Sequence, residues 1–172
     1  MFNGKRMRKS CGGDPIKGLF AGMLAGAAGS WVMNQLQQTG GPGDTARREE
    51  RGNVEEPATV KAAEAVSRRV FHHELSDCEK QVAEPVVHYG YGALLGGVYG
   101  AMAEVAPAPS AGLGIPFAAA AWFLGDEVAV PALGLGKKPT EYLSRTHADA
   151  LAAHFAYGLT TDLLRRALRH VI

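Results

Sequence analysis

Long apolar stretches alternate with charged segments along this chain. Residues 16–36 contain a single charged side chain, Lys17, which lies at the edge of the stretch, where a lysine can extend its ammonium group to water. About 20 apolar residues are enough for a helix to cross the hydrocarbon core of a bilayer. Stretches of similar length follow in the second half of the chain. The pattern predicts four transmembrane helices, over residues 16–36, 86–105, 113–135 and 147–168.

The fourth stretch is the least apolar, but its polar residues are regularly spaced. Positions that recur every three or four residues share one face of a helix. The other faces of this stretch carry Ala, Leu, Phe and Tyr, so the polar face can lie inside a bundle while the rest contacts lipid. The residues on the polar face are His147, Leu151, His154, Gly158, Asp162 and Arg165.

The segment 39–84 separates the first two apolar stretches and is rich in charge. Within it, residues 59–71 place Val60, Val66 and Phe71 on one face and charged side chains on the other. This spacing predicts a short amphipathic helix that lies on the membrane surface or caps the bundle. The whole chain, 1–172, is therefore expected to be a single all-α domain, a membrane four-helix bundle with one polar loop.

Small residues recur every four positions in the first two spans. Glycine accounts for 22 of the 172 residues, about twice its usual share of ~7%. Such spacing lets a second helix approach closely. The second helix can belong to the same chain, to a second copy or to another membrane subunit. The glycines concerned are Gly18, Gly22, Gly26, Gly92, Gly96 and Gly100.

Positive charge near the ends of the spans predicts the topology. Lys and Arg accumulate on the cytoplasmic side of membrane proteins. Five flank the first span, at Lys5, Arg6, Arg8, Lys9 and Lys17, and three end the last one, at Arg165, Arg166 and Arg169. Both termini are thus expected in the cytoplasm of a bacterial inner membrane, with the polar loop in the periplasm.

The same charges bear on three further questions. The basic N-terminus is also typical of a signal peptide, but the apolar stretch is longer than the ~7–15 residues of one. The net charge of +1 excludes a strongly basic nucleic-acid binder. Cys11 and Cys78 fall on opposite sides of the membrane in this topology, so no disulfide is expected.

Five ionisable residues are predicted near the periplasmic ends of the last three spans: His88, Asp126, Glu127, His147 and His154. Asp126 lies about nine residues, or ~13 Å, below the outer end of its span. A charge inside a span costs roughly 2.5–3.5 kcal/mol, so such groups usually face a partner or a water-filled cavity.

Three interpretations of these five residues remain open. A carboxylate–histidine hydrogen bond would join spans three and four. A pocket open to the periplasm would respond to protons or ions, because histidine titrates near neutrality. A metal site would use His88, His154, Asp126 and Glu127. At the cytoplasmic end, Glu104, Asp162, Arg165 and Arg166 are expected to form ion pairs.

Several short motifs occur in an order that resembles a known family. They include Val87-His88-Tyr89-Gly90-Tyr91-Gly92, Ala103-Glu104-Val105-Ala106-Pro107, Pro131-Ala132-Leu133-Gly134-Leu135 and Asp162-Leu163-Leu164-Arg165-Arg166. The chain resembles the YagU-type inner membrane proteins, a family of uncharacterised bacterial proteins. The resemblance implies a helical inner membrane protein with cytoplasmic termini, and it implies no catalytic residues. Asp126 and Glu127 depart from the less acidic stretch of that family.

No recognised reaction motif accompanies this architecture. The sequence has no phosphate-binding loop, no G-x-S-x-G elbow and no C-x-x-C pair, and no motif requires a cofactor. We expect a membrane protein without catalytic activity, a structural or accessory component that contacts the bilayer. The alternatives are a proton-responsive or ion- or solute-conducting element that uses the His, Asp and Glu cluster, and a metal-binding membrane protein.

Overall fold

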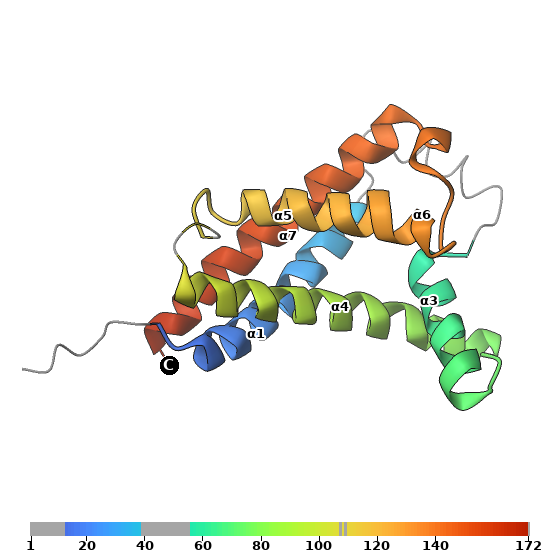
Figure 1. Cartoon of the computed structure of the whole chain (residues 1–172), viewed down its shortest axis with the longest axis horizontal. Helices are drawn as coiled ribbons and strands as arrows, with labels where there is room; N and C mark the ends of the chain where they lie inside the picture. The colour runs from blue at the N-terminus through green and yellow to red at the C-terminus, as the bar shows by residue number, and fades with distance from the viewer. Residues whose placement is uncertain (1–12, 39–55, 107, 109, 172) are drawn as a thin grey trace, which may run out of the picture.

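A computed structural model describes residues 13–38, 56–106, 108 and 110–171, and all regular secondary structure in them is helical (Figure 1). The all-α prediction is confirmed for this part of the chain. The basic residues before position 13, Cys11 and residues 39–55 of the charged segment lie outside the described residues. The elements are α1 (Pro15–Gln38), α3 (Ala58–Val66), η1 (Ser67–Phe71), α4 (Asp77–Val105), α5 (Ile115–Trp122), η2 (Phe123–Ala129), α6 (Val130–Ala132), η3 (Pro139–Glu141) and α7 (Ser144–Val171).

Side-chain caps explain where α1 and α4 begin. The Asp14 carboxylate accepts hydrogen bonds from the backbone N–H groups of Ile16 at 3.0 Å and Lys17 at 3.2 Å, which satisfies two of the free donors at the helix start. Ser76 and Glu79 form a capping box before α4. Helix α4 therefore begins at Asp77, nine residues before the predicted start at residue 86.

The third predicted span, 113–135, is helical but not uniform. It begins after Gly114, whose positive φ of 78° suits glycine, and continues from α5 through the seven-residue π-helix η2 into α6. A π-helix is wider than an α-helix and is found mostly at functional sites. Asp126 and Glu127 both lie in η2.

The long helices pack in the order α4, α1, α7, α5. In Figure 1, α4 and α5 run across the view with nearly parallel axes, while α1 and α7 cross them at an angle. At one end, the Tyr99 ring of α4 stacks on Phe117 of α5, with ring centroids 4.5 Å apart. Toward the other end, where α1 ends and α7 begins, the space between α4 and α5 is open and is covered in part by α3.

Helices α1 and α4 meet along a glycine seam, which consists of Gly18, Gly22 and Gly26 facing Gly100, Gly96 and Gly92. All six are buried. A Cβ atom added at Gly18 would lie 2.5 Å from the carbonyl oxygen of Gly100, a distance that real Cβ atoms do not show. These glycines pack within one chain. Of the three partners that the spacing allows, the structure shows the one within the same chain, and association with a second copy or another subunit stays a prediction.

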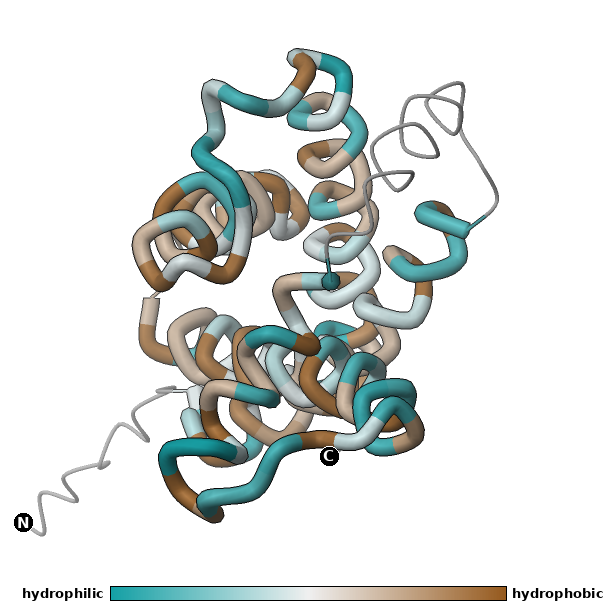
Figure 2. Tube along the Cα trace, turned by 90° about the vertical axis from the view of Figure 1, so that its right-hand side faces the viewer, coloured by the Kyte–Doolittle hydropathy of each residue, from teal (hydrophilic) through white to brown (hydrophobic). Residues whose placement is uncertain are grey.

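Large apolar side chains lie outside the described bundle, and small or polar ones lie inside. Phe20, Leu24 and Trp31 of α1 are 58%, 65% and 56% exposed, whereas Asp162 and Thr161 are fully buried. In Figure 2, apolar and pale residues follow the long helices, while hydrophilic residues gather in connecting segments. The arrangement reverses the usual order of a protein folded in water.

Two helical segments of the described residues are long and apolar enough to cross a membrane. They are Pro15–Gln38 and Ile115–Ala132. Helices α4 and α7 are long enough, with 29 and 28 residues, but they fall short of the same criterion of composition. Two of the four predicted spans thus meet it, and the placement of all four in a membrane belongs to the proposal below.

Candidate functional site

Two adjoining cavities open between α4, η2 and the start of α7. We call the first the polar cavity. Its volume is about 440 Å³, and its lining includes Glu84, Lys137 and Tyr142. The second, the apolar cavity, has a volume of about 360 Å³ and is lined by side chains such as Val87 and Leu95. The two cavities share Gln37, Ala58, Thr59, His88, Asp126, Val130 and Leu135.

Helix α3 covers this region and is fastened to α4 by one lysine. The Lys80 ammonium lies 2.7 Å from the Glu56 carboxylate and 2.8 Å from that of Glu64. These two hydrogen bonds raise the pKa of Lys80 above its ordinary value, and the contact with Lys80 lowers the pKa of Glu64. Ala58 and Thr59 at the start of α3 line both cavities. The amphipathic helix predicted at 59–71 is confirmed as α3 with η1, and it caps the bundle rather than standing apart from it.

His147 and Glu127 form the closest polar contact of the site. The Nδ1 atom of His147 lies 2.5 Å from Oε1 of Glu127, and its Nε2 atom lies 2.9 Å from the carbonyl oxygen of Pro139. A carbonyl oxygen only accepts hydrogen bonds, so Nε2 carries a proton. The contact between Nδ1 and the carboxyl group then requires a second proton, on either the ring or the carboxyl. The pair therefore holds one proton beyond those of a neutral imidazole and a carboxylate.

His154 and Asp126 approach each other less closely. Their nearest atoms, Nδ1 and Oδ2, are 3.9 Å apart, which is too far for a hydrogen bond. Nδ1 of His154 instead donates to the carbonyl oxygen of Ala150 at 2.9 Å. The Asp126 side chain is 45% exposed and lines both cavities. The hydrogen-bonded pair between η2 and α7 is thus Glu127 with His147.

The structure brings all five predicted residues of the cluster to the two cavities. Nε2 of His88 donates toward the Ser30 carbonyl oxygen of α1 at 3.3 Å, and His88 lines both spaces. Nowhere in the described residues do three His, Cys, Asp or Glu side chains gather closely enough to hold a metal ion. The interpretation of the cluster as a metal site therefore gains no support from this geometry.

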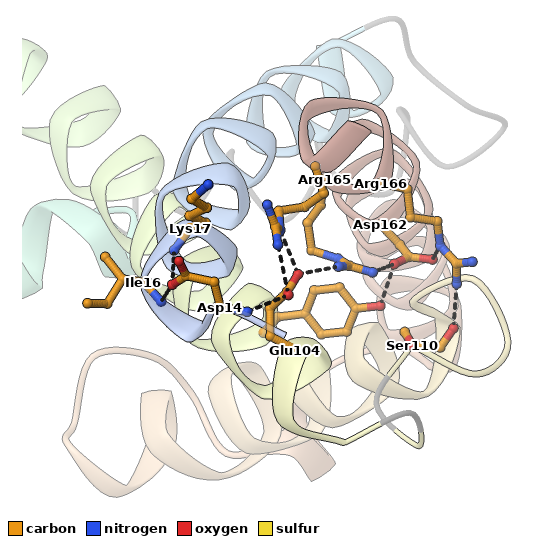
Figure 3. Close-up of polar contacts among 10 residues, drawn as sticks. Asp14, Ile16, Lys17, Glu104, Ser110, Asp162, Arg165 and Arg166 are labelled. Atoms are coloured by element: carbon orange, nitrogen blue, oxygen red, sulfur yellow. Dashed lines mark hydrogen bonds and ion pairs between the residues drawn. The ribbon is translucent and has the colours of Figure 1, made fainter. Parts of the chain in front are cut away.

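The opposite end of the bundle contains a network of arginines and carboxylates (Figure 3). Asp162 accepts hydrogen bonds from the Tyr99 hydroxyl at 2.8 Å, from Arg165 at 3.0 Å and from Arg166 at 2.8 Å. Arg165 lies between Asp162 and Glu104, 3.7 Å from the latter. The four residues expected to pair from the sequence, Glu104, Asp162, Arg165 and Arg166, are thus neighbours.

Three members of this network were not predicted from the sequence. Glu104 also binds Arg169 at 2.7 Å and the backbone N–H of Asp14 at 3.1 Å. The third member is Tyr99, for whose hydroxyl no partner was predicted. Arg169 follows Arg165 by one helical turn, and Asp14 precedes Pro15 in a typical helix start, so both left a signal in the sequence. No local pattern indicates the partner of Tyr99, because α4 and α7 are far apart in the sequence.

Compared with protein-family models, curated proteins and solved structures, the chain matches none of them. The resemblance to the YagU-type proteins thus stays a prediction from the motifs. The function proposed below therefore rests on the geometry of the two cavities and on which side chains are exposed.

Proposed function

We propose that this chain is an integral membrane protein whose four helical layers, α1, α4, α5–η2–α6 and α7, cross a bacterial inner membrane. In this proposal it acts as a structural or accessory component rather than as an enzyme. The observation that carries it is the reversed order of burial. Large apolar side chains on a surface mark contact with lipid or protein, and ionisable residues within spans face the bundle interior.

Helix α1 shows this distribution of exposed and buried side chains most clearly. Ile16, Phe20, Leu24 and Trp31 are each more than half exposed, while the buried face consists of glycine, alanine and serine together with one methionine. In water, leaving each of these side chains exposed instead of buried would cost roughly 1.5–3 kcal/mol of folding free energy. In hydrocarbon there is no such loss, and close backbone packing through small residues holds the helices together. The apolar segment Ile115–Ala132 is even more exposed, with 11% of its apolar window buried.

The arrangement of the charges supports both termini on the cytoplasmic side. The start of α1 and the ends of α4 and α7 meet at the network of Glu104, Asp162 and Arg165. That end also carries Arg166 and Arg169, in addition to the basic residues that precede position 13 in the sequence. The positive-inside tendency assigns this end to the cytoplasm, and the two cavities then open toward the periplasm.

A pair of lysine substitutions tests the membrane placement. Leu24 and Leu143 are similarly exposed, at 65% and 57%, but Leu24 lies in the middle of α1 and Leu143 lies between η3 and α7. Leu24→Lys should sharply reduce the protein recovered in membranes, because a central lysine costs about 2.5–3.5 kcal/mol on insertion. Leu143→Lys should be recovered like the wild type. The recovered protein should also resist extraction at alkaline pH.

Two results would contradict the placement. Wild-type protein that leaves the membranes at alkaline pH without detergent is not integral. Equal recovery of Leu24→Lys and Leu143→Lys would show that the exposed face of α1 does not contact lipid. Reporter fusions after residue 172 test the topology, and activity of a periplasmic reporter there would reverse it.

A second candidate function follows from the proton held between His147 and Glu127. Because this pair lines the polar cavity, we propose that it lets the protein respond to the pH of the compartment on that side. The tryptophan fluorescence of the purified protein should change between pH 8 and pH 5. His147→Gln should abolish the transition, and His73→Gln, which alters an exposed histidine outside both cavities, should leave it intact. Persistence of the transition in His147→Gln would overturn this candidate.

A further inference from the structure

The apolar cavity has the size and lining of a small-molecule site. Its volume of about 360 Å³ falls within the ~300–1,000 Å³ of such sites. Val87 and Leu95 of α4 form one side, and Ala121 and Leu133 form the other. This apolar lining gives way to ionisable groups where the cavity meets the polar cavity. A molecule that filled both parts would need an apolar portion and a polar portion.

The order of these two parts matches that of a lipid leaflet. The polar cavity lies at the end of the bundle where α1 ends and α7 begins, as Gln37 and Thr146 in its lining show. The apolar cavity extends from there toward the middle of the helices, as far as Leu95 and Tyr157. At the opposite end of the bundle the rings of Tyr99 and Phe117 stack, so the two cavities lie toward one end of the helices. A chain-bearing molecule of that leaflet could enter with its headgroup already in place.

The charge of the lining selects the headgroup. The polar cavity contains four carboxylates, those of Glu56, Glu84, Asp126 and Glu127, against the ammonium of Lys137 and the imidazoles of His88 and His147. Two of these carboxylates have close cationic or protonated partners, Glu56 in Lys80 and Glu127 in His147. Asp126 lies where the two cavities join and is 45% exposed. This lining repels an anionic headgroup and attracts a cationic one.

We propose that the two cavities together bind an amphiphile with an alkylammonium headgroup. The nitrogen lies against the Asp126 carboxylate, and the alkyl chain fills the apolar cavity between Leu95 and Ala121. This inference rests on the membrane placement proposed above, because the order of the two cavities matches that of a lipid leaflet only if the helices cross a bilayer.

Retention of three probes with equal chain length tests the site. The full-length protein, purified in a neutral maltoside detergent, is incubated with dodecylammonium, dodecanoate or dodecanol, and the retained probe is counted by native mass spectrometry. One dodecylammonium per chain should be retained in preference to the other two. Asp126→Asn should lower that retention at least about tenfold, which is typical for the loss of a charged hydrogen-bond partner. Asp149→Asn, an exposed carboxylate on α7 outside both cavities, should retain the probe like the wild type.

A second variant keeps the test decisive if Asp126→Asn does not fold. Ala121→Leu narrows the apolar cavity and should lower retention of dodecylammonium more than that of hexylammonium. Equal retention of dodecylammonium and dodecanol by the wild type, or no effect of either variant, would overturn the proposal. Alkaline extraction decides the membrane placement separately, since a protein that stays in the membrane and retains no dodecylammonium refutes only the binding site.

Discussion

The glycine seam between α1 and α4 can be tested with two alanine substitutions in one helix. A Cβ atom at Gly96 would lie 2.7 Å from the Cα atom of Gly26 and closer still to the carbonyl oxygen of Gly22. A Cβ atom at Gly90 would meet no atom within 4 Å. Both substitutions replace a helical glycine by alanine, so the gain in helix propensity, about 1 kcal/mol, is common to both. Their difference isolates the steric effect at the seam.

The size of that effect follows from the distances. Carbon atoms in contact with backbone carbonyl oxygens normally lie about 3.3–3.6 Å away, so Gly96→Ala requires α1 and α4 to separate by roughly 1 Å. A gap of 0.5–1 Å removes a quarter to a half of the dispersion energy of each facing atom pair, and overpacking of this kind typically costs about 1–3 kcal/mol. Relative to Gly90→Ala, we expect Gly96→Ala to be less stable by that amount.

Thermal unfolding in a neutral detergent, followed by circular dichroism at 222 nm, measures the difference. A change of 1 kcal/mol shifts Tm by about 2–4 °C in a chain of this size, so Gly96→Ala should melt several degrees below Gly90→Ala. Equal melting temperatures would show that α1 and α4 are not in close contact at Gly96. A change of oligomeric state at unchanged Tm would restore the alternative in which these glycines join separate chains.

Three further substitutions probe other parts of the molecule. Hydrogen bonds from Ser76 lower the pKa of Glu79 to about 2, so this carboxylate stabilises the fold above its ordinary pKa of 4.5 and loses that effect as the pH falls toward 2; Glu79→Gln should show a smaller loss of Tm over this interval. Tyr99→Phe should lower the free energy of unfolding by about 1–3 kcal/mol, because buried Asp162 loses a donor. Lys80→Met should increase proteolysis of α3, because two carboxylates lose their shared partner.

Each of these expectations has a contrary result. An unchanged dependence of Tm on pH in Glu79→Gln would show that the capping box does not persist in solution. If Tyr99→Phe melts with the wild type, the hydroxyl does not serve the buried carboxylate. Cleavage in α3 at the wild-type rate in Lys80→Met would mean that other contacts hold this helix against α4.

Periodicity predicted the helices well, because the burial of one helix face follows the 3.6-residue repeat. The span at 16–36 corresponds to α1, and the stretch at 147–168 lies within α7. The predicted span began at residue 86, which is too late, because the capping box of Ser76 and Glu79 marks the start of α4 at Asp77. The π-helical geometry of η2 left no periodic signal, because one wider turn is too short to alter the repeat.

Part of the candidate site could be predicted from the sequence for a similar reason. Asp126 and His154 were predicted to belong to one cluster of ionisable residues near the same ends of their spans, and their nearest atoms lie 3.9 Å apart. The partner choice within the cluster, Glu127 with His147, was not readable, since it depends on the rotation of η2 about its axis. The cavities themselves are lined by residues from segments far apart in the chain, so no local pattern encodes them.

Besides the ion pairs of Asp162 with Arg165 and Arg166 within α7, charged groups of this helix bind partners in segments that precede it in the chain. Asp162 is bound by Tyr99, Arg165 faces Glu104, and Arg166 donates to the carbonyl oxygen of Ser110. Alone in a bilayer, each of these charges would cost about 2.5–3.5 kcal/mol on insertion. Since synthesis proceeds from the N-terminus, α4 and the turn after it are already made when α7 emerges. A segment that would enter a membrane poorly on its own is therefore made after the groups of α4 and of the following turn that bind its charged side chains.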